Sequence, residues 1–264
     1  MKIRPKPNLR RVFNSGVTRI AALTARSRLG AITHVRTEDP VAALTFDDGP
    51  HPEHTPELLS ILERYKARAT FFMIGEMAQK HLDLVRRIAH AGHAIANHSW
   101  SHPSFPLLTR RECIRQLIEC EKTLAPYGQK LFRPPYCHLG LKNSWAIAGA
   151  GHRIIAFNVH AEDWLDRDAE WIANRLAERI RPGCIVILHD NIYRSILPSA
   201  RYDRSTMLEG LRVALDRLAG RYQFVTVPEL MRHGQVVREP WQRQAPANFQ
   251  SALRHKLERN GADR

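Results

Sequence analysis

The chain has 264 residues, of which 44% are apolar and 25% charged, and these proportions are ordinary for a folded globular protein. This composition excludes a disordered chain, a collagen and a disulfide-stapled miniprotein. The length is sufficient for one large domain with a well-buried core, or for two small domains.

The formal net charge of +14 is unusual, and it is concentrated at the two ends of the chain. Residues 1–37 hold nine Lys/Arg and no acidic residue, and residues 232–264 hold seven Lys/Arg against three acids. Residues 38–231 hold 24 Lys/Arg and 23 Asp/Glu, so the middle is nearly neutral. We therefore expect a basic N-terminal arm (1–37), a central domain (38–232) and a basic C-terminal tail (233–264), with both ends dispensable for the chemistry.

The basic ends of the chain also bear on where in the cell the protein is located. No apolar run approaches the roughly 20 residues that a membrane-spanning helix needs. No uninterrupted apolar segment follows the first basic residues before Arg19, which disfavours a secretory signal peptide. We expect a cytoplasmic protein whose ends are solvated arms or contact an anionic membrane peripherally, with an organelle transit peptide as a further alternative. Nucleic-acid binding is disfavoured, because the basic residues flank the core and no nucleic-acid motif is present.

From residue 41 onward, short β-rich segments alternate with longer helical patterns. In chain order the prediction is strand Val41–Phe46, helix Glu53–Lys66, strand Ala69–Ile74, helix His81–Ala91, strand Ala94–Asn97, helix Thr109–Leu124, strand Leu131–Arg133, helix Asn143–Gly149, strand Ile154–Asn158, helix Asp168–Arg181, strand Cys184–Leu188, helix Met207–Leu218 and strand Phe224–Thr226. This alternation implies parallel strands joined by right-handed crossovers. Seven such strands could close into a barrel or form an open sheet, and in both cases ligands gather at the carboxyl ends of the strands.

Two adjacent carboxylates, Asp47 and Asp48, follow the first predicted strand within the segment TFDDGP. Successive side chains of a regular strand face opposite sides, so both carboxylates can face one pocket only where the chain leaves strand geometry. The dipeptide Gly49-Pro50 provides such a break. A solvated Asp-Gly-Pro turn is the alternative interpretation.

Two histidines, His98 and His102, follow the third predicted strand within the segment HSWSHP. Their i, i+4 spacing places two imidazoles on one face of a helical turn, where they can share a metal ion, although such a pair is common by chance. Pro103 disfavours helix at His102, so we expect at most one helical turn that opens a loop. Together with one carboxylate from Asp48, the two imidazoles would make a catalytic zinc arrangement that leaves positions open for water and substrate.

Polar residues follow three further predicted strands. Arg133 opens the rigid turn RPPY, Asp163 lies beyond the fifth strand, and His189 follows the apolar run that includes Ile187. Each of these alone is consistent with ordinary packing or an ion pair. Five polar clusters at successive strand ends instead predict one shared site.

These five motifs, in this order, resemble those of the NodB-homology polysaccharide deacetylases, also called carbohydrate esterase family 4. The resemblance covers roughly residues 40–232 and leaves both basic ends unexplained. It implies an α/β fold, a distorted (β/α) barrel of about seven parallel strands. It also implies a metal-dependent hydrolase that removes N-acetyl groups from amino-sugar residues of a glycan.

The resemblance implies that Asp48, His98 and His102 bind a divalent metal, usually zinc, with cobalt or another divalent ion as alternatives. Asp47 matches the general base and His189 the general acid of the family. These residue types suit the reaction, because a divalent metal acidifies water and a neighbouring carboxylate can take the released proton. The departing sugar amine is a poor leaving group unless a cationic acid protonates it.

The remaining matches concern residues that support the reacting groups. Arg133 matches the residue that holds the base, and Asp163 matches the partner of the acid. Tyr136 would contribute its backbone N–H to the developing oxyanion. Trp164 and Ile187 would line the acetyl pocket.

The motifs do not identify which glycan is the substrate. Chitin oligosaccharides, peptidoglycan, an exopolysaccharide and a lipid-linked precursor all present N-acetylated amino sugars. The lack of a predicted signal peptide favours an intracellular oligosaccharide or a lipid-carried glycan over peptidoglycan. A protein that only binds glycans is disfavoured, because the residues matching the base and the acid are both present.

Overall fold

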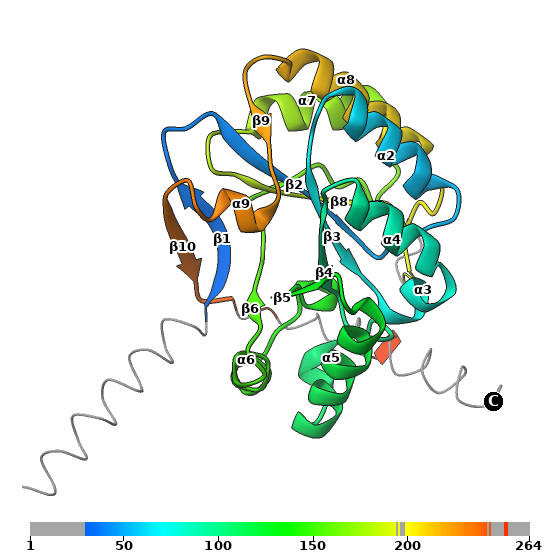
Figure 1. Ribbon diagram of the computed structural model, residues 1–264, viewed down its shortest axis with the longest axis vertical. Helices are drawn as coiled ribbons and strands as arrows, with labels where there is room; N and C mark the ends of the chain where they lie inside the picture. The colour runs from blue at the N-terminus through cyan, green and yellow to red at the C-terminus, as the bar shows by residue number, and fades with distance from the viewer. Residues whose placement is uncertain (1–29, 194, 196–198, 242, 244–250, 253–264) are drawn as a thin grey trace, which may run out of the picture.

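A computed structural model describes residues 30–193, 195, 199–241, 243 and 251–252 of the chain. Its centre is a curled parallel sheet with the strand order β6-β5-β4-β3-β2-β8-β7, and β9 pairs with the start of β2 (Figure 1). The strands are β2 (Val41–Asp47), β3 (Ala69–Met73), β4 (Ala94–Asn97), β5 (Gly128–Phe132), β6 (Arg153–Ile154), β7 (Val159–His160), β8 (Ile185–His189) and β9 (Gln223–Phe224). The predicted fold, a distorted barrel of about seven parallel strands, is confirmed.

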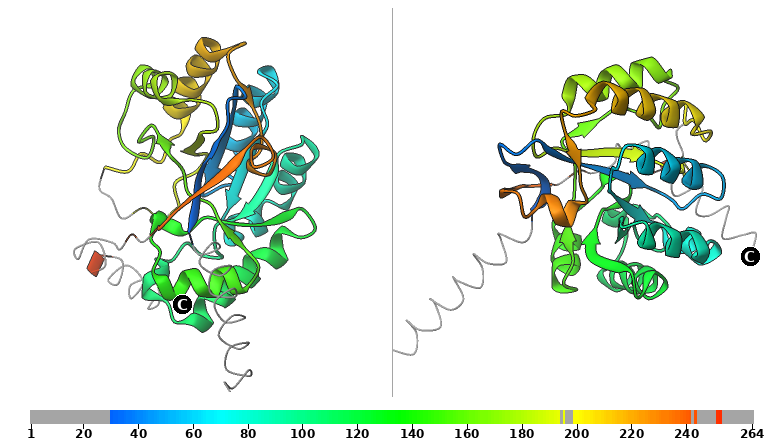
Figure 2. Two further views of the ribbon diagram at one scale, coloured as in Figure 1. Left: turned by 90° about the vertical axis from the view of Figure 1, so that its left-hand side faces the viewer. Right: turned by 45° about the horizontal axis from the view of Figure 1, so that its top comes forward.

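Most of the helices lie around the outside of this sheet (Figure 2), whereas the short helix Val227–Leu230 packs against the cluster that contains Val41 and Ala43. The helices are α2 (His54–Arg64), α3 (Gly75–Lys80), α4 (Leu82–His90), α5 (Arg110–Leu124), α6 (Leu141–Gly149), α7 (Ala169–Arg179), α8 (Ser205–Leu218) and α9 (Val227–Leu230), with short 3-10 turns at Phe105–Leu107 and Pro135–Cys137. A capping box begins α5, since the Thr109 hydroxyl accepts from the Glu112 N–H and the Glu112 carboxylate accepts from the Thr109 N–H.

The central strand β2 divides its side chains between two apolar cores. Leu44 and Phe46 pack outward against the helices, whereas Val41 and Ala43 pack into the interior of the barrel. This alternation follows from the two-residue period of a strand. Buried on both faces, β2 is almost continuously apolar, as is typical of a central parallel strand. By the same period, Asp47 lies at the carboxyl end of the inward row.

Two predicted elements differ from the observed ones for tertiary reasons. The predicted strand Ile154–Asn158 does not form. Two short strands, β6 and β7, lie at its ends instead, because the backbone N–H groups of Ile155, Ala156 and Asn158 donate to three different segments in turn. Helix α3 was not predicted. Its first two N–H groups donate to the carbonyl oxygens of Ser99 and Trp100, so a distant loop satisfies its N-terminus.

Two strands lie outside the predicted central domain. β1 (Ala31–Arg36) and β10 (Gln235–Glu239) pair antiparallel, and Ala31, Ile32 and Val35 are almost completely buried. Ile32 bridges to Ile155, while the Val35 N–H donates to the Gly183 carbonyl oxygen, so β1 spans the gap between the β6 end of the sheet and β8. The boundaries expected at residues 37 and 232 therefore exclude two strands that belong to the folded unit. They were placed by net charge, which gives no information on which apolar side chains are buried.

The expectation that the basic ends are dispensable thus cannot extend to the segments that form β1 and β10. Residues 1–29, which carry most of the N-terminal arm, lie outside the described residues, as does most of the C-terminal tail. Among the helices of the described ranges, none is both long enough and apolar enough to cross a bilayer.

Candidate active site

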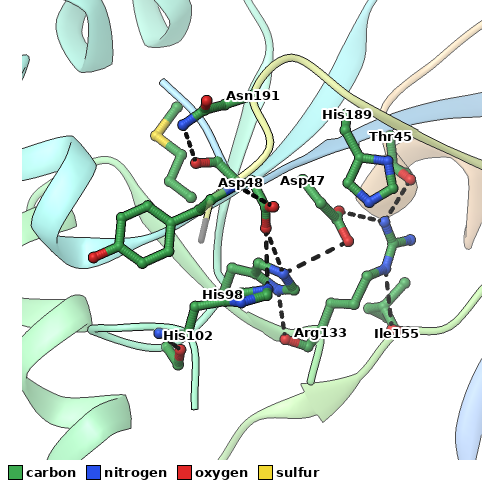
Figure 3. Close-up of polar contacts among 12 residues, drawn as sticks. Thr45, Asp47, Asp48, His98, His102, Arg133, Ile155, His189 and Asn191 are labelled. Atoms are coloured by element: carbon green, nitrogen blue, oxygen red, sulfur yellow. Dashed lines mark hydrogen bonds and ion pairs between the residues drawn. The ribbon is translucent and has the colours of Figure 1, made fainter. Parts of the chain in front are cut away.

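The predicted site residues lie where the parallel strands end. Asp47 is the last residue of β2 and is the register partner of His189, the last residue of β8. His98 directly follows β4, and Arg133 directly follows β5. Because these strands are neighbours in one parallel sheet, their carboxyl ends meet, and the side chains converge as predicted (Figure 3).

Asp48 and the two predicted histidine ligands form one buried cluster. The Asp48 Oδ1 atom lies 3.3 Å from Nε2 of His98 and 3.1 Å from Nε2 of His102. One ligand atom from each residue falls within 4.8 Å of the others. Asp48 reaches this position because its φ of 74° turns the backbone out of strand geometry, as expected of the break at Gly49-Pro50.

This cluster has the chemistry of a cation site. His98 Nδ1 lies 2.8 Å from the Arg133 carbonyl oxygen, which can only accept, so Nδ1 carries a proton and Nε2 is the ring nitrogen that faces Asp48. The Asp48 Oδ1 atom is buried and accepts no hydrogen bond from the described residues. A carboxylate oxygen and two imidazole nitrogens at these distances are stable together when a proton or a metal cation lies between them. The three residues therefore fit a divalent metal.

The electrostatics favour the metal-binding protonation states. Burial alone would raise the pKa of Asp48, but His102 and His98 outweigh this effect and hold the pKa well below its usual value. Burial lowers the pKa of His102, despite the opposing charge of Asp48. An ionised carboxylate beside a neutral imidazole is the pair that a metal requires.

The segment between the two histidines is the predicted loop, without the helical turn that could open it. Ser99 and His102 have positive φ values of 71° and 59°, and no helix forms there. Instead, the Gln116 side-chain oxygen of α5 accepts from the N–H groups of Trp100 and Ser101, both at 2.9 Å. The imidazoles thus converge through loop geometry. Gln116 was missed because its partners are backbone groups, which leave no motif in the sequence.

Asp47 has different partners from its neighbour Asp48. Its Oδ1 accepts from Arg133 Nη1 at 2.6 Å, and its Oδ2 lies 3.8 Å from His98 Nε2. Arg133 is completely buried, and its guanidinium also donates to the Ile155 and Ala156 carbonyl oxygens. The arginine therefore holds one carboxylate oxygen and leaves the other toward the cluster.

His189 is held by a second buried ion pair. Its backbone N–H donates to Asp163 Oδ2 at 2.9 Å, and its Nδ1 lies 3.2 Å from Asp163 Oδ1. Burial alone would lower the pKa of His189, but the Asp163 carboxylate outweighs burial and raises it above the usual value. Nε2 is left as the ring nitrogen on the other side from Asp163.

Arg204 supports this pair and was not predicted. Its Nη2 donates to Asp163 Oδ2 at 3.0 Å, and its Nε donates to the His189 carbonyl oxygen at 3.2 Å. The side chain is almost completely buried at the start of α8. A single arginine, some 40 residues after Asp163, carries no spacing signal that could have identified it.

A cavity of about 290 Å³ opens onto these groups. Eight of the ten predicted site residues line it, namely Asp47, Asp48, His98, His102, Tyr136, Trp164, Ile187 and His189. The other two, Arg133 and Asp163, are buried behind the lining and contact Asp47 and His189. Tyr136 has a positive φ of 55°, and the Trp164 ring packs edge-on against the His189 ring at 5.5 Å.

Comparisons with known proteins agree with this geometry. A family model described as polysaccharide deacetylase matches residues 34–154. A peptidoglycan-N-acetylglucosamine deacetylase of Bacillus cereus is 32% identical over 204 residues, covering 75% of this chain and 92% of that protein. A chitooligosaccharide deacetylase of Sinorhizobium fredii is 35% identical over 158 residues, covering 58% of this chain and 74% of that protein.

The fold is also shared with solved structures. The structure of the peptidoglycan deacetylase PdaC from Bacillus subtilis matches with a TM-score of 0.65 and 31% sequence identity, covering 75% of this chain and 93% of that chain. The family-model match spans the strand ends that carry Asp48, His98 and Arg133. Because sequence and fold agree over most of the length of these relatives, the chain belongs to the polysaccharide deacetylase family.

Proposed function

We propose that the chain hydrolyses the N-acetyl group of amino-sugar residues in a glycan, with the two adjacent aspartates in different roles. The observation that carries this proposal is that their nearest partners differ. Asp48 faces two imidazole nitrogens, whereas Asp47 is held by the Arg133 guanidinium. Figure 3 shows Asp48 directed to both imidazoles and Asp47 to the Arg133 guanidinium, with a longer contact between Asp47 and His98.

Asp48, His98 and His102 would hold a divalent metal, consistent with the metal dependence of the family. Two imidazoles and one carboxylate suit zinc, and cobalt or another divalent ion remains an alternative. When bound, such a metal polarises a carbonyl oxygen and makes water more acidic. The three protein ligands leave positions open for substrate and water.

Asp47 would act as the general base and His189 as the general acid. Arg133 fixes Asp47 Oδ1, so Oδ2 is the oxygen available to take a proton from water. Asp163 accepts from His189 Nδ1, so Nε2 is the atom that would donate a proton to the departing amine. The two residues are register partners at adjacent strand ends and can therefore act on one bound acetamido group.

The remaining cavity residues would bind the acetyl group. The backbone N–H of Tyr136 would donate to the developing oxyanion, with the left-handed backbone of this turn setting its direction. Trp164 and Ile187 provide apolar surface for the methyl group. The cavity is lined by residues that lie at or follow the carboxyl ends of β2, β4, β5, β6, β7 and β8, and we propose that it receives the acetamido group.

The names of the relatives narrow the substrate class to glycans that contain N-acetylated amino sugars, as in peptidoglycan and chitooligosaccharides. We include lipid-linked precursors, because the basic residues at both ends of the chain would attract an anionic membrane surface. Under this proposal, the basic ends bring the protein to an anionic membrane surface, and the residues at the strand ends carry out the hydrolysis.

The direct test is acetate release from a panel of soluble chitooligosaccharides, peptidoglycan fragments and a lipid-linked N-acetylated sugar. We expect acetate from at least one glycan, loss of this activity after chelation, and recovery when zinc is added. The absence of acetate from every member of the panel, with metal-loaded and folded protein, would contradict the proposal.

The pH dependence tests the assignment of the acid. Because Asp163 raises the pKa of His189, the protonated acid persists to higher pH than for an ordinary histidine. Activity should fall as pH rises through this pKa. Asp163→Asn removes the stabilising charge, so the alkaline limb of the kcat profile should move to lower pH.

Asp166→Asn is the matched control for this variant, because Asp166 is 84% exposed and pairs only at the surface with Arg201. An unchanged alkaline limb in Asp163→Asn would refute the assignment.

A further inference from the structure

The segment directly after β8 lies against the loop that carries Asp48. We call residues 190–193 the β8 latch. The Asn191 side-chain Nδ2 donates to the Asp48 backbone carbonyl oxygen at 3.2 Å (Figure 3). The Tyr193 backbone N–H donates to Asp48 Oδ2 at 2.9 Å. The latch therefore contacts both the backbone and the side chain of one proposed metal ligand.

The backbone contact acts on a strained residue. Asp48 has a φ of 74°, in the left-handed region that costs energy for residues with a Cβ atom, although less for Asp and Asn than for others. Such a conformation persists only where surrounding contacts enforce it. The hydrogen bond from Asn191 fixes the carbonyl group of this residue, and therefore the direction in which the Asp48 side chain leaves the loop.

The side-chain contact selects one carboxylate oxygen. The Tyr193 N–H occupies Oδ2, whereas Oδ1 faces His98 and His102 without a hydrogen-bond donor from the described residues. A carboxylate held in this way offers one oxygen to a metal. The latch thereby determines both the orientation of Asp48 and the oxygen that it presents.

The latch is itself anchored on two sides. The Asp190 carboxylate lies over Gly49, where a Cβ atom would come within 2.2 Å of Asp190 Oδ2, and this oxygen accepts from the Thr55 hydroxyl. The Tyr193 hydroxyl donates to the Glu76 carboxylate at the start of α3. The latch is therefore held in place by contacts with α2, α3 and the loop after β2. Because its own position is held, its hydrogen bonds restrict the position of Asp48.

We propose that Asn191, as the central side chain of the β8 latch, is a positioning residue that sets the affinity of the Asp48–His98–His102 site for its metal. This inference rests on the metal site described under the proposed function, and it concerns a residue outside the five sequence motifs. Groups that orient a metal ligand typically change metal affinity by about 10- to 100-fold when they are removed.

The test is the zinc dissociation constant of the full-length protein, measured by competition with a chromophoric chelator. Asn191→Ala should weaken zinc binding by about 10- to 100-fold, with kcat largely restored at saturating zinc and little change in the melting temperature of the metal-free protein. Asn191→Asp, which keeps the shape but removes the donor, should weaken binding as well. Asn158→Ala is the matched control, because the Asn158 side chain bonds the backbone N–H of Ile185 at the opposite end of β8.

The outcomes separate this inference from the proposed function. Zinc affinity of Asn191→Ala within about threefold of the unmodified protein would overturn the role of the latch, even if the protein is an active deacetylase. Conversely, weakened zinc binding in a protein that releases no acetate would support the latch and contradict the function. If Asn191→Ala fails to fold, Asn191→Asp and Asn191→Ser decide the question by the same measurement. An equal loss of zinc affinity in Asn158→Ala would also overturn the proposal, because it would show that zinc binding weakens whenever the fold is destabilised.

Discussion

Replacing Asp47 by Asn should lower kcat by about 10²- to 10⁴-fold, the range for loss of a general acid–base group, while metal content stays unchanged. The amide keeps the size of the side chain but cannot take a proton from water. Arg133 and His98 keep their other contacts, so the metal ligands stay in place. Excess zinc should not restore the activity.

Asp48→Asn is the matched variant, because it makes the same chemical change one residue later. Here an anionic metal ligand becomes a neutral amide, so zinc affinity should fall and excess zinc should recover part of the activity. Metal analysis and single-turnover acetate release on both purified variants provide the measurement. If Asp47→Asn lost its metal while Asp48→Asn retained it, the two roles would be reversed. Normal turnover in both variants would contradict metal-dependent hydrolysis at this site.

The second large effect is on stability. Arg133→Met should lower the free energy of unfolding by about 3–5 kcal/mol, the range for removing one partner of a buried ion pair. Arg133 is completely buried, so its loss leaves the Asp47 carboxylate without its cation at 2.6 Å. The Ile155 and Ala156 carbonyl oxygens lose a hydrogen-bond donor at the same time. Urea denaturation of the metal-free protein measures the change.

Arg133→Lys separates charge from geometry. Lysine keeps the positive charge but lacks the planar fork that donates to Asp47 and to two backbone carbonyl groups at once. We expect a smaller loss of stability than in Arg133→Met, together with reduced kcat, because Asp47 is oriented less well. Equal stability of Arg133→Met and the unmodified protein would show that the buried pair contributes nothing net to folding.

Local sequence predicted the parallel strands and their functional ends well. Apolar runs such as Val41–Phe46 are long enough to identify buried strands without any tertiary information. Once the strands are parallel, their carboxyl ends must meet, so the polar residues that follow them are neighbours in space. For this reason Asp48, His98 and His189 could be assigned to one site from their positions in the chain, and the family resemblance suggested their roles.

At most one helical turn opening a loop was expected at His98–His102, and the structure has the loop without the turn, because the spacing of two ligands does not specify the backbone between them. Tertiary hydrogen bonds from Gln116, together with positive φ values at Ser99 and His102, favour a loop over one short, Pro-terminated turn. An isolated helical turn has too few internal hydrogen bonds to compete with such contacts.

The sequence by itself determined the alternation of strands and helices, and the order in which the chemical groups follow the strands. Only the tertiary structure decided the bridging contacts of β1 with the parallel sheet, the burial of Arg204 behind Asp163 and the contact of Asn191 with Asp48. These contacts join residues that are distant in the chain through backbone groups or single side chains. The periodicity of apolar residues arises within one helix or strand. It therefore cannot predict contacts that form only when distant segments pack together.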